Sequence, residues 1–91
     1  MMEQKFLAQL EANRQKALTL GVRIRPVEDM KQARRLLSGS RTSDGFGDLE
    51  KKGQLKLSLE ALVVDKRFTA LFSDDEANSA LMRLLDAGYG F

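Results

Sequence analysis

Apolar residues recur at intervals of three and four positions near the start of the chain, as they do along one face of an α-helix. Phe6, Leu10, Ala17 and Leu20 follow this spacing, with the polar Asn13 at the position between Leu10 and Ala17. Gly21 comes directly after them and is a typical residue at the end of a helix. The pattern therefore predicts a helix over residues 3–20.

Residues 27–38 show the same helical spacing, with apolar residues at positions 27, 30, 33, 36 and 37. Glu28 and Asp29 occupy the first predicted turn, and Arg34 and Arg35 occupy the last. Both placements favour a helix, because acidic side chains stabilise its N-terminal end and basic side chains its C-terminal end. We therefore expect a second helix over residues 27–38.

Residues 73–76 have the sequence of a capping box, in which Ser73 and Glu76 satisfy the first free N–H groups of a helix. Apolar residues at helical spacing follow, and Gly88 ends the pattern. We expect a helix over residues 74–87. Capping also accounts for the acidic residues 74–76, and three adjacent carboxylates do not converge on one metal ion.

Residues 54–59 have the alternation of a strand, with leucines at positions 55, 57 and 59 and polar residues between them. Residues 60–72 then fit a helix. The adjacent β-branched residues Val63 and Val64 leave open a continuation of the strand through residue 64. Val22 and Ile24 alternate with Arg23 and Arg25 in the same way, which predicts a short strand over residues 22–25.

Residues 38–48 hold three glycines and several small polar residues without apolar periodicity, and we expect a flexible loop over residues 39–53. Together these elements predict one small domain over residues 1–91. Its expected class is α+β, predominantly α. It comprises four helices at about 3–20, 27–38, 60–72 and 74–87, with two short strands at about 22–25 and 54–59.

The chain contains no cysteine and no histidine, which excludes disulfides, thiolate metal sites and histidine-based catalysis. The sequence also lacks a phosphate-binding loop, a calcium loop and any evident nucleophile–base pair. We therefore expect no enzyme, no catalytic residues, no cofactor and no metal site. No apolar run approaches the roughly 18 residues of a membrane span, so we expect no membrane contact and a cytoplasmic location.

The positive charge of the chain is concentrated in one segment. Residues 23–41 hold six basic residues against two acidic ones, a net charge of +4, whereas the whole chain carries +2. A local basic patch is typical of a phosphate-binding surface, and a solvated helix face is the alternative. The candidate nucleic-acid-binding residues are Arg23, Arg25, Lys31, Arg34, Arg35 and Arg41, with Lys56 as a further contact.

Residues 54–87 resemble ribbon-helix-helix DNA-binding domains, because they are expected to form a strand followed by two helices. The sequence QLKLSL is similar to the ribbon of that family. The resemblance implies that two chains pair these strands, with Gln54, Lys56 and Ser58 entering the major groove. It also implies that the second helix holds a phosphate at its N-terminus.

Two functional hypotheses follow from these patterns. The first is a small non-enzymatic accessory or regulatory protein that binds DNA or RNA through residues 23–41. The second is a protein-interaction module or adaptor with amphipathic helices and an aromatic C-terminal tail. Its candidate partner-binding residues are Phe46, Tyr89 and Phe91. A chain of this length buries a modest core, so we also expect a homodimer.

Overall fold

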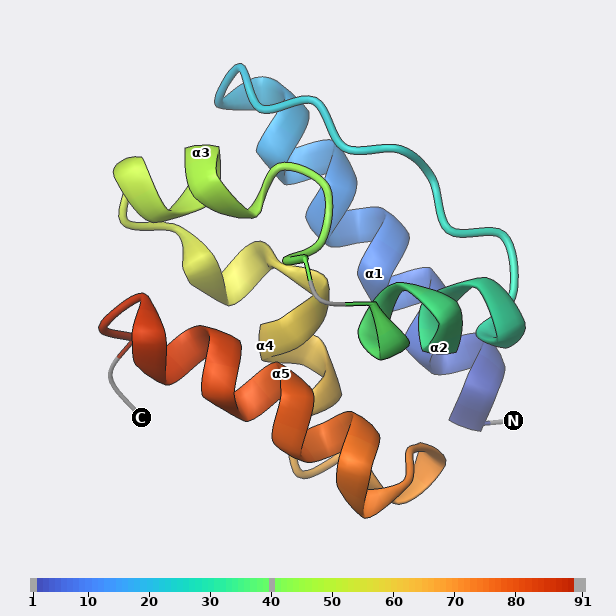
Figure 1. Cartoon of the computed structure of the whole chain (residues 1–91). Helices are drawn as coiled ribbons and strands as arrows, with labels where there is room; N and C mark the ends of the chain where they lie inside the picture. The colour runs from blue at the N-terminus through green and yellow to red at the C-terminus, as the bar shows by residue number, and fades with distance from the viewer. Residues whose placement is uncertain (1, 40, 90–91) are drawn as a thin grey trace.

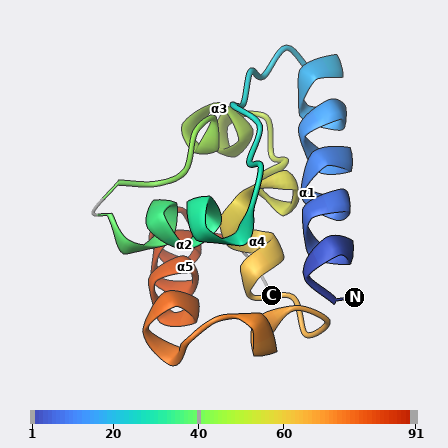
Figure 2. The same cartoon turned by 90° about the vertical axis from the view of Figure 1, so that its right-hand side faces the viewer.

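The computed structural model describes residues 2–39 and 41–89, and all regular secondary structure within them is helical. α1 runs along one side of the molecule, α5 along the opposite side, and α4 lies between them (Figure 1, Figure 2). α5 packs against both α4 and α2. The α-helices are α1 (Met2–Thr19), α2 (Met30–Ser38), α3 (Phe46–Lys51), α4 (Leu59–Val63) and α5 (Asp74–Asp86), and the 3-10 helices are η1 (Leu55–Leu57) and η2 (Thr69–Leu71).

The predicted α+β class is wrong, because neither expected strand forms in the described part of the chain. Residues 54–59 form η1 and the start of α4 instead. Ser58 explains the change, because its hydroxyl donates to the carbonyl of Leu55 and accepts from the N–H of Ala61, so that it caps α4. Leu55 and Leu57 are buried because η1 contacts α1, α3 and α4 together, and Leu59 is buried as the first residue of α4.

Residues 22–25 run as an irregular connection from α1 to α2 rather than as a strand. The N–H of Arg25 donates to the carboxylate of Asp44 at 2.8 Å, and Pro26 has no N–H to offer. Gly45 lies against the same segment with φ +77°, and a Cβ placed there would approach Ile24 Cγ1 to 2.8 Å. A loop therefore occupies the place that a partner strand would need.

The predicted flexible loop over residues 39–53 contains a helix, α3, that the sequence analysis did not anticipate. Phe46 and Leu49 hold it against the core, where they are 4% and 0% exposed. Six residues span less than two turns, so that an apolar period cannot be recognised in the sequence.

The other helices agree with the predictions in place but not always in extent. α5 begins at the predicted capping box, in which Ser73 accepts from the N–H of Glu76 and the Glu76 carboxylate accepts from the N–H of Ser73. α2 begins at Met30 rather than at residue 27, because Asp29 is its N-cap. The predicted helix over 60–72 is wrong beyond α4, since residues 64–68 form turns and η2 follows.

Two groups of buried side chains form the interior. In the first, the ring of Phe6 from α1 meets Phe68 and Phe72 edge to face, with ring centroids 5.4 and 5.1 Å apart. Such pairs add to the free energy gained by burial of the rings. The second group joins the C-terminal end of α1 to α3, η1 and α5 and includes Phe46 and Leu84.

Candidate nucleic-acid interface

The eight arginines of the chain fall into two groups that differ in their ion pairs. Four have a carboxylate oxygen within 4.0 Å, at partners Glu11, Glu76, Asp65 and Glu60. The other four have no such partner among the described residues. The paired arginines are Arg14, Arg34, Arg67 and Arg83, and the unpaired arginines are Arg23, Arg25, Arg35 and Arg41.

All four unpaired arginines lie within the predicted basic segment, and all four are exposed. Lys31 is also exposed and has no ion pair with a described residue. The connection over residues 22–29 and α2 both lie on the side of the molecule that faces the viewer in Figure 2. We call the set Arg23, Arg25, Lys31, Arg35 and Arg41 the 23–41 basic surface.

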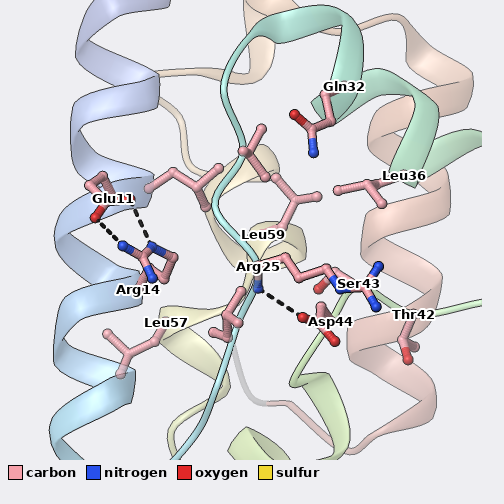
Figure 3. A pocket seen from close by; sticks show the side chains of 13 residues that line it. Glu11, Arg14, Arg25, Gln32, Leu36, Thr42, Ser43, Asp44, Leu57 and Leu59 are labelled. Atoms are coloured by element: carbon pink, nitrogen blue, oxygen red, sulfur yellow. Dashed lines mark hydrogen bonds and ion pairs between the residues drawn. The ribbon is translucent and has the colours of Figure 1, made fainter.

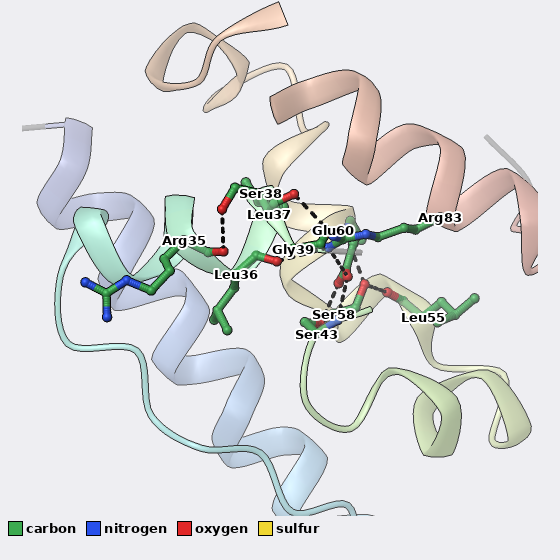
Figure 4. A network of polar contacts seen from close by, with 11 residues as sticks. Arg35, Leu36, Leu37, Ser38, Gly39, Ser43, Leu55, Ser58, Glu60 and Arg83 are labelled. Atoms are coloured by element: carbon green, nitrogen blue, oxygen red, sulfur yellow. Dashed lines mark hydrogen bonds and ion pairs between the residues drawn. The ribbon is translucent and has the colours of Figure 1, made fainter. Parts of the chain in front are cut away.

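The sequence of α2 places its charges on the outside. Met30, Ala33 and Leu37 are buried at intervals of three and four residues, which turns Lys31 and Arg35 toward solvent one helical turn apart. Figure 4 shows the guanidinium of Arg35 pointing away from the polar network behind the helix. This face of α2 therefore offers two cations on a regular scaffold.

Two predicted contact residues lie apart from this surface. Arg34 donates to the carbonyl of Leu71 at 2.8 Å and lies 4.0 Å from the carboxylate of Glu76, so that it bridges α2 to the start of α5. Lys56 lines a hollow with Tyr89 at the C-terminal end of α5, and none of the 23–41 basic surface lines that hollow. Five of the seven predicted cations are thus exposed residues of the 23–41 segment that have no ion pair with a described residue.

The predicted partner-binding aromatics are largely occupied within the fold. Phe46 is 4% exposed and belongs to the core beside Leu49, so its ring is not available to a partner in this conformation. Tyr89 is half-buried and packs against the same core group, and its N–H donates to the carbonyl of Leu84. Phe91 lies outside the described residues.

A buried polar network that the sequence analysis missed holds α2 in place (Figure 4). Glu60, with no exposed surface, accepts hydrogen bonds from the N–H and hydroxyl of Ser43 and from Arg83 at 3.2 Å. Arg83 also donates to the carbonyls of Gly39 and Leu37 at 2.6 and 3.2 Å. The sequence signal for this network is one charge inside the otherwise apolar stretch 59–64.

These bonds fix both ends of α2. The carbonyls at the C-terminal end of a helix lack partners within the helix, and Arg83 supplies donors to them. At the other end, the Asp29 carboxylate accepts from the N–H of Gln32 at 2.8 Å. The basic face of α2 is consequently held in a fixed orientation by the bonds from Arg83 of α5.

Two of the paired arginines, Arg14 and Arg67, bind carboxylates whose pKa they lower. The hydrogen bonds from Arg14, and next from Gln15, lower the pKa of Glu11 from 4.5 to about 2. The side-chain hydrogen bonds from Arg67, and next its backbone hydrogen bond, also lower the pKa of Asp65. Arg14 and Arg67 therefore contribute less to the field around the protein than the unpaired arginines do.

A hollow of about 340 Å³ lies beside the basic surface, between α1, the connection over residues 24–27 and the 42–44 loop (Figure 3). Six of its thirteen lining residues are leucine, isoleucine or valine, and the other seven are polar or charged, with Arg25, Thr42 and Asp44 among them. Within residues 2–39 and 41–89, no three acidic, cysteine or histidine side chains group as a metal site.

Comparison with protein families, curated proteins and solved structures found no match for this chain. The likeness to ribbon-helix-helix domains therefore stays a prediction, and the described residues contain no strand from which its ribbon would be built. None of the described helices combines the length and the apolar character that crossing a bilayer requires.

Proposed function

We propose that this protein binds nucleic acid through the phosphates, using the 23–41 basic surface. The observation that supports the proposal is the distribution of the arginines: every arginine without a carboxylate partner among the described residues falls within residues 23–41. Contacts to phosphates supply most of the affinity of sequence-independent binding. The five cations of the 23–41 basic surface are exposed and can make such contacts.

The pairing state matters because a phosphate competes with any carboxylate that already holds the arginine. Arg14 donates two hydrogen bonds to Glu11, at 2.7 and 2.8 Å, and would have to give them up. Arg23 and Arg35 have no such bonds to carboxylates of the described residues, so they lose none when they contact a phosphate. The competing interpretation is that these charges form a solvated helix face. In that case the affinity for polyanions depends only on the net charge of the protein and not on which arginines carry it.

Fluorescence anisotropy with a labelled random-sequence DNA duplex tests the proposal at about 50 mM salt, where phosphate contacts bind strongly. The double variant Arg23→Gln/Arg35→Gln should weaken binding several-fold or more. The matched control Arg14→Gln/Arg67→Gln removes the same net charge from paired arginines and should retain most of the affinity. Equal losses in both variants, or no binding by the unmodified protein, would contradict the proposal.

The second candidate function is interaction with another protein chain through the outer face of α5. The specific observation is that Met82 and Leu85, three residues apart on this helix, are 55% and 50% exposed. Apolar side chains in such positions are used at interfaces between chains. Light scattering of the free protein and of Met82→Gln/Leu85→Gln tests it: a homodimer that becomes a monomer supports this candidate, and a monomer in both cases argues against pairing of like chains.

A further inference from the structure

The hollow lined by α1 and by residues of the 24–27 connection has the size of a small-ligand site and combines apolar with polar lining residues (Figure 3). Its volume of about 340 Å³ lies at the lower end of the range of roughly 300–1,000 Å³ that is common for such sites. Leucines from α1, α2, η1 and α4 line it together with two residues of the connection. These apolar residues are Leu10, Leu36, Leu57, Leu59, Ile24 and Val27.

Most of the polar side chains around the hollow are bonded to other groups of the protein. Arg14 and Glu11 bind each other, and both oxygens of Glu11 are used. The amide of Gln32 accepts from the N–H of Glu28 and donates to the Pro26 carbonyl. Ser43 binds Glu60 through its hydroxyl and its N–H. None of these groups needs a ligand to satisfy it.

Arg25 and Thr42 differ from the rest of the lining. Neither side chain makes a hydrogen bond or an ion pair with another described residue, and Figure 3 shows the side chain of Arg25 extending toward Thr42. The nearby carboxylate of Asp44 accepts from the main-chain N–H of Arg25, not from its guanidinium. The edge of the hollow therefore presents a guanidinium and a hydroxyl that have no partner among residues 2–39 and 41–89, and both are donors suited to an anion.

We propose that the hollow binds a small amphiphilic anion, whose apolar chain lies on the leucines while its carboxylate accepts from Arg25 and Thr42. The charge of Arg25 favours an anionic head group, and the six apolar lining residues favour an aliphatic tail. This site goes beyond the proposed binding of nucleic acid, since Lys31 and Arg35 do not line the hollow and the leucine walls offer nothing to a phosphate backbone.

Octanoate is the probe for the test, added to the full chain while backbone amides are followed by NMR. We expect saturable shifts centred on residues 24–27 and 42–44. Arg25→Gln should weaken octanoate binding about tenfold, because a hydrogen bond to a charged group is lost. Arg23→Gln is the matched control, since it removes the same charge one position before Ile24 from a residue that does not line the hollow, and it should bind octanoate normally.

Octylammonium, with the same chain and the opposite charge, should produce no saturable shifts in this region. Lys31→Gln/Arg35→Gln should bind octanoate as the unmodified protein does even if its binding of DNA is lost, which separates this proposal from the nucleic-acid proposal. The site would be ruled out by an absence of saturable shifts, by shifts centred on other residues, or by equal weakening in Arg23→Gln and Arg25→Gln. Binding of octylammonium as tight as that of octanoate would rule out the role of Arg25.

Discussion

The guanidinium of Arg83 lies 3.2 Å from the carboxylate of Glu60, a side chain with no exposed surface, and the same guanidinium binds the carbonyls at the end of α2. One arginine of α5 therefore neutralises a buried charge of α4 and also anchors the helix that presents Lys31 and Arg35. The orientation of the candidate interface depends on an ion pair on the opposite side of α2.

Replacement of Glu60 by glutamine should lower the free energy of unfolding by about 3 kcal/mol. This is the usual cost of removing one partner of a buried ion pair, because the other charge is left without compensation. The amide has one acceptor in place of two, and its NH₂ group would face donors from Ser43 and Arg83. Urea unfolding of Glu60→Gln measures the loss. Glu50→Gln, an exposed change on α3, is the control and should alter stability little.

Arg83→Lys separates the two tasks of this arginine. Lysine keeps the positive charge near Glu60 but cannot donate from two nitrogens at once to Glu60 and to the carbonyls of Leu37 and Gly39. We expect faster amide hydrogen exchange in the last turn of α2, with α1 little changed, as measured by NMR. Unchanged exchange in α2 would show that Arg83 does not anchor the helix.

Gly45→Ala should destabilise the protein more than Gly53→Ala does. Both glycines have positive φ, at +77° and +67°, so either alanine is strained by about 1 kcal/mol. Only at Gly45 does the added Cβ also meet Ile24 Cγ1 at 2.8 Å, whereas nothing lies within 4 Å at Gly53. Thermal unfolding of the two variants should differ by roughly 1 kcal/mol or more, as expected for overpacking. Equal effects would mean that residues 22–25 do not pack against this loop.

The pairing of Glu11 with Arg14 predicts a specific dependence on pH. The pKa of Glu11 is lowered from 4.5 to about 2, so its contribution to stability is complete above pH 4.5 and is lost as pH falls toward 2. The contribution is small because the pair is exposed to solvent. Carbon-detected NMR titration of the Glu11 side chain should give a midpoint well below 4.5. A midpoint near 4.5 would show that Arg14 is not held by Glu11 and is available to anions.

The sequence predicted the helices whose ends carry local signals. The capping residues Ser73 and Glu76 mark the start of α5 correctly, and the apolar period of α1 is long enough to be recognised. The strand predicted at 54–59 is wrong because alternating leucines, here at 55, 57 and 59, also occur in a segment that is buried on several sides without belonging to a sheet. The choice between a strand and a helix at these residues depended on Ser58, whose capping role can be seen only once α4 is known.

Some features of the candidate interface could be predicted from the sequence, and others could not. The excess of positive charge in residues 23–41 is evident from the sequence, but the separation of Arg34 from Arg35 is not. These neighbours differ because Arg34 meets Leu71 and Glu76, which lie 37 and 42 positions further along the chain. Likewise, the burial of Glu60 depends on Arg83 and Ser43, and contacts over such separations leave no local pattern.

The salt dependence of DNA binding tests the central claim most directly. If the 23–41 basic surface contacts phosphates, log K for a random-sequence duplex falls linearly with log salt, with a slope near −0.9 for each phosphate contacted. Five contacts correspond to a slope of about −4.5, and Arg23→Gln/Arg35→Gln should reduce its magnitude by about 2 while Arg14→Gln/Arg67→Gln leaves it nearly unchanged. No detectable binding at about 50 mM salt, or a slope that the two double variants change equally, would contradict the account.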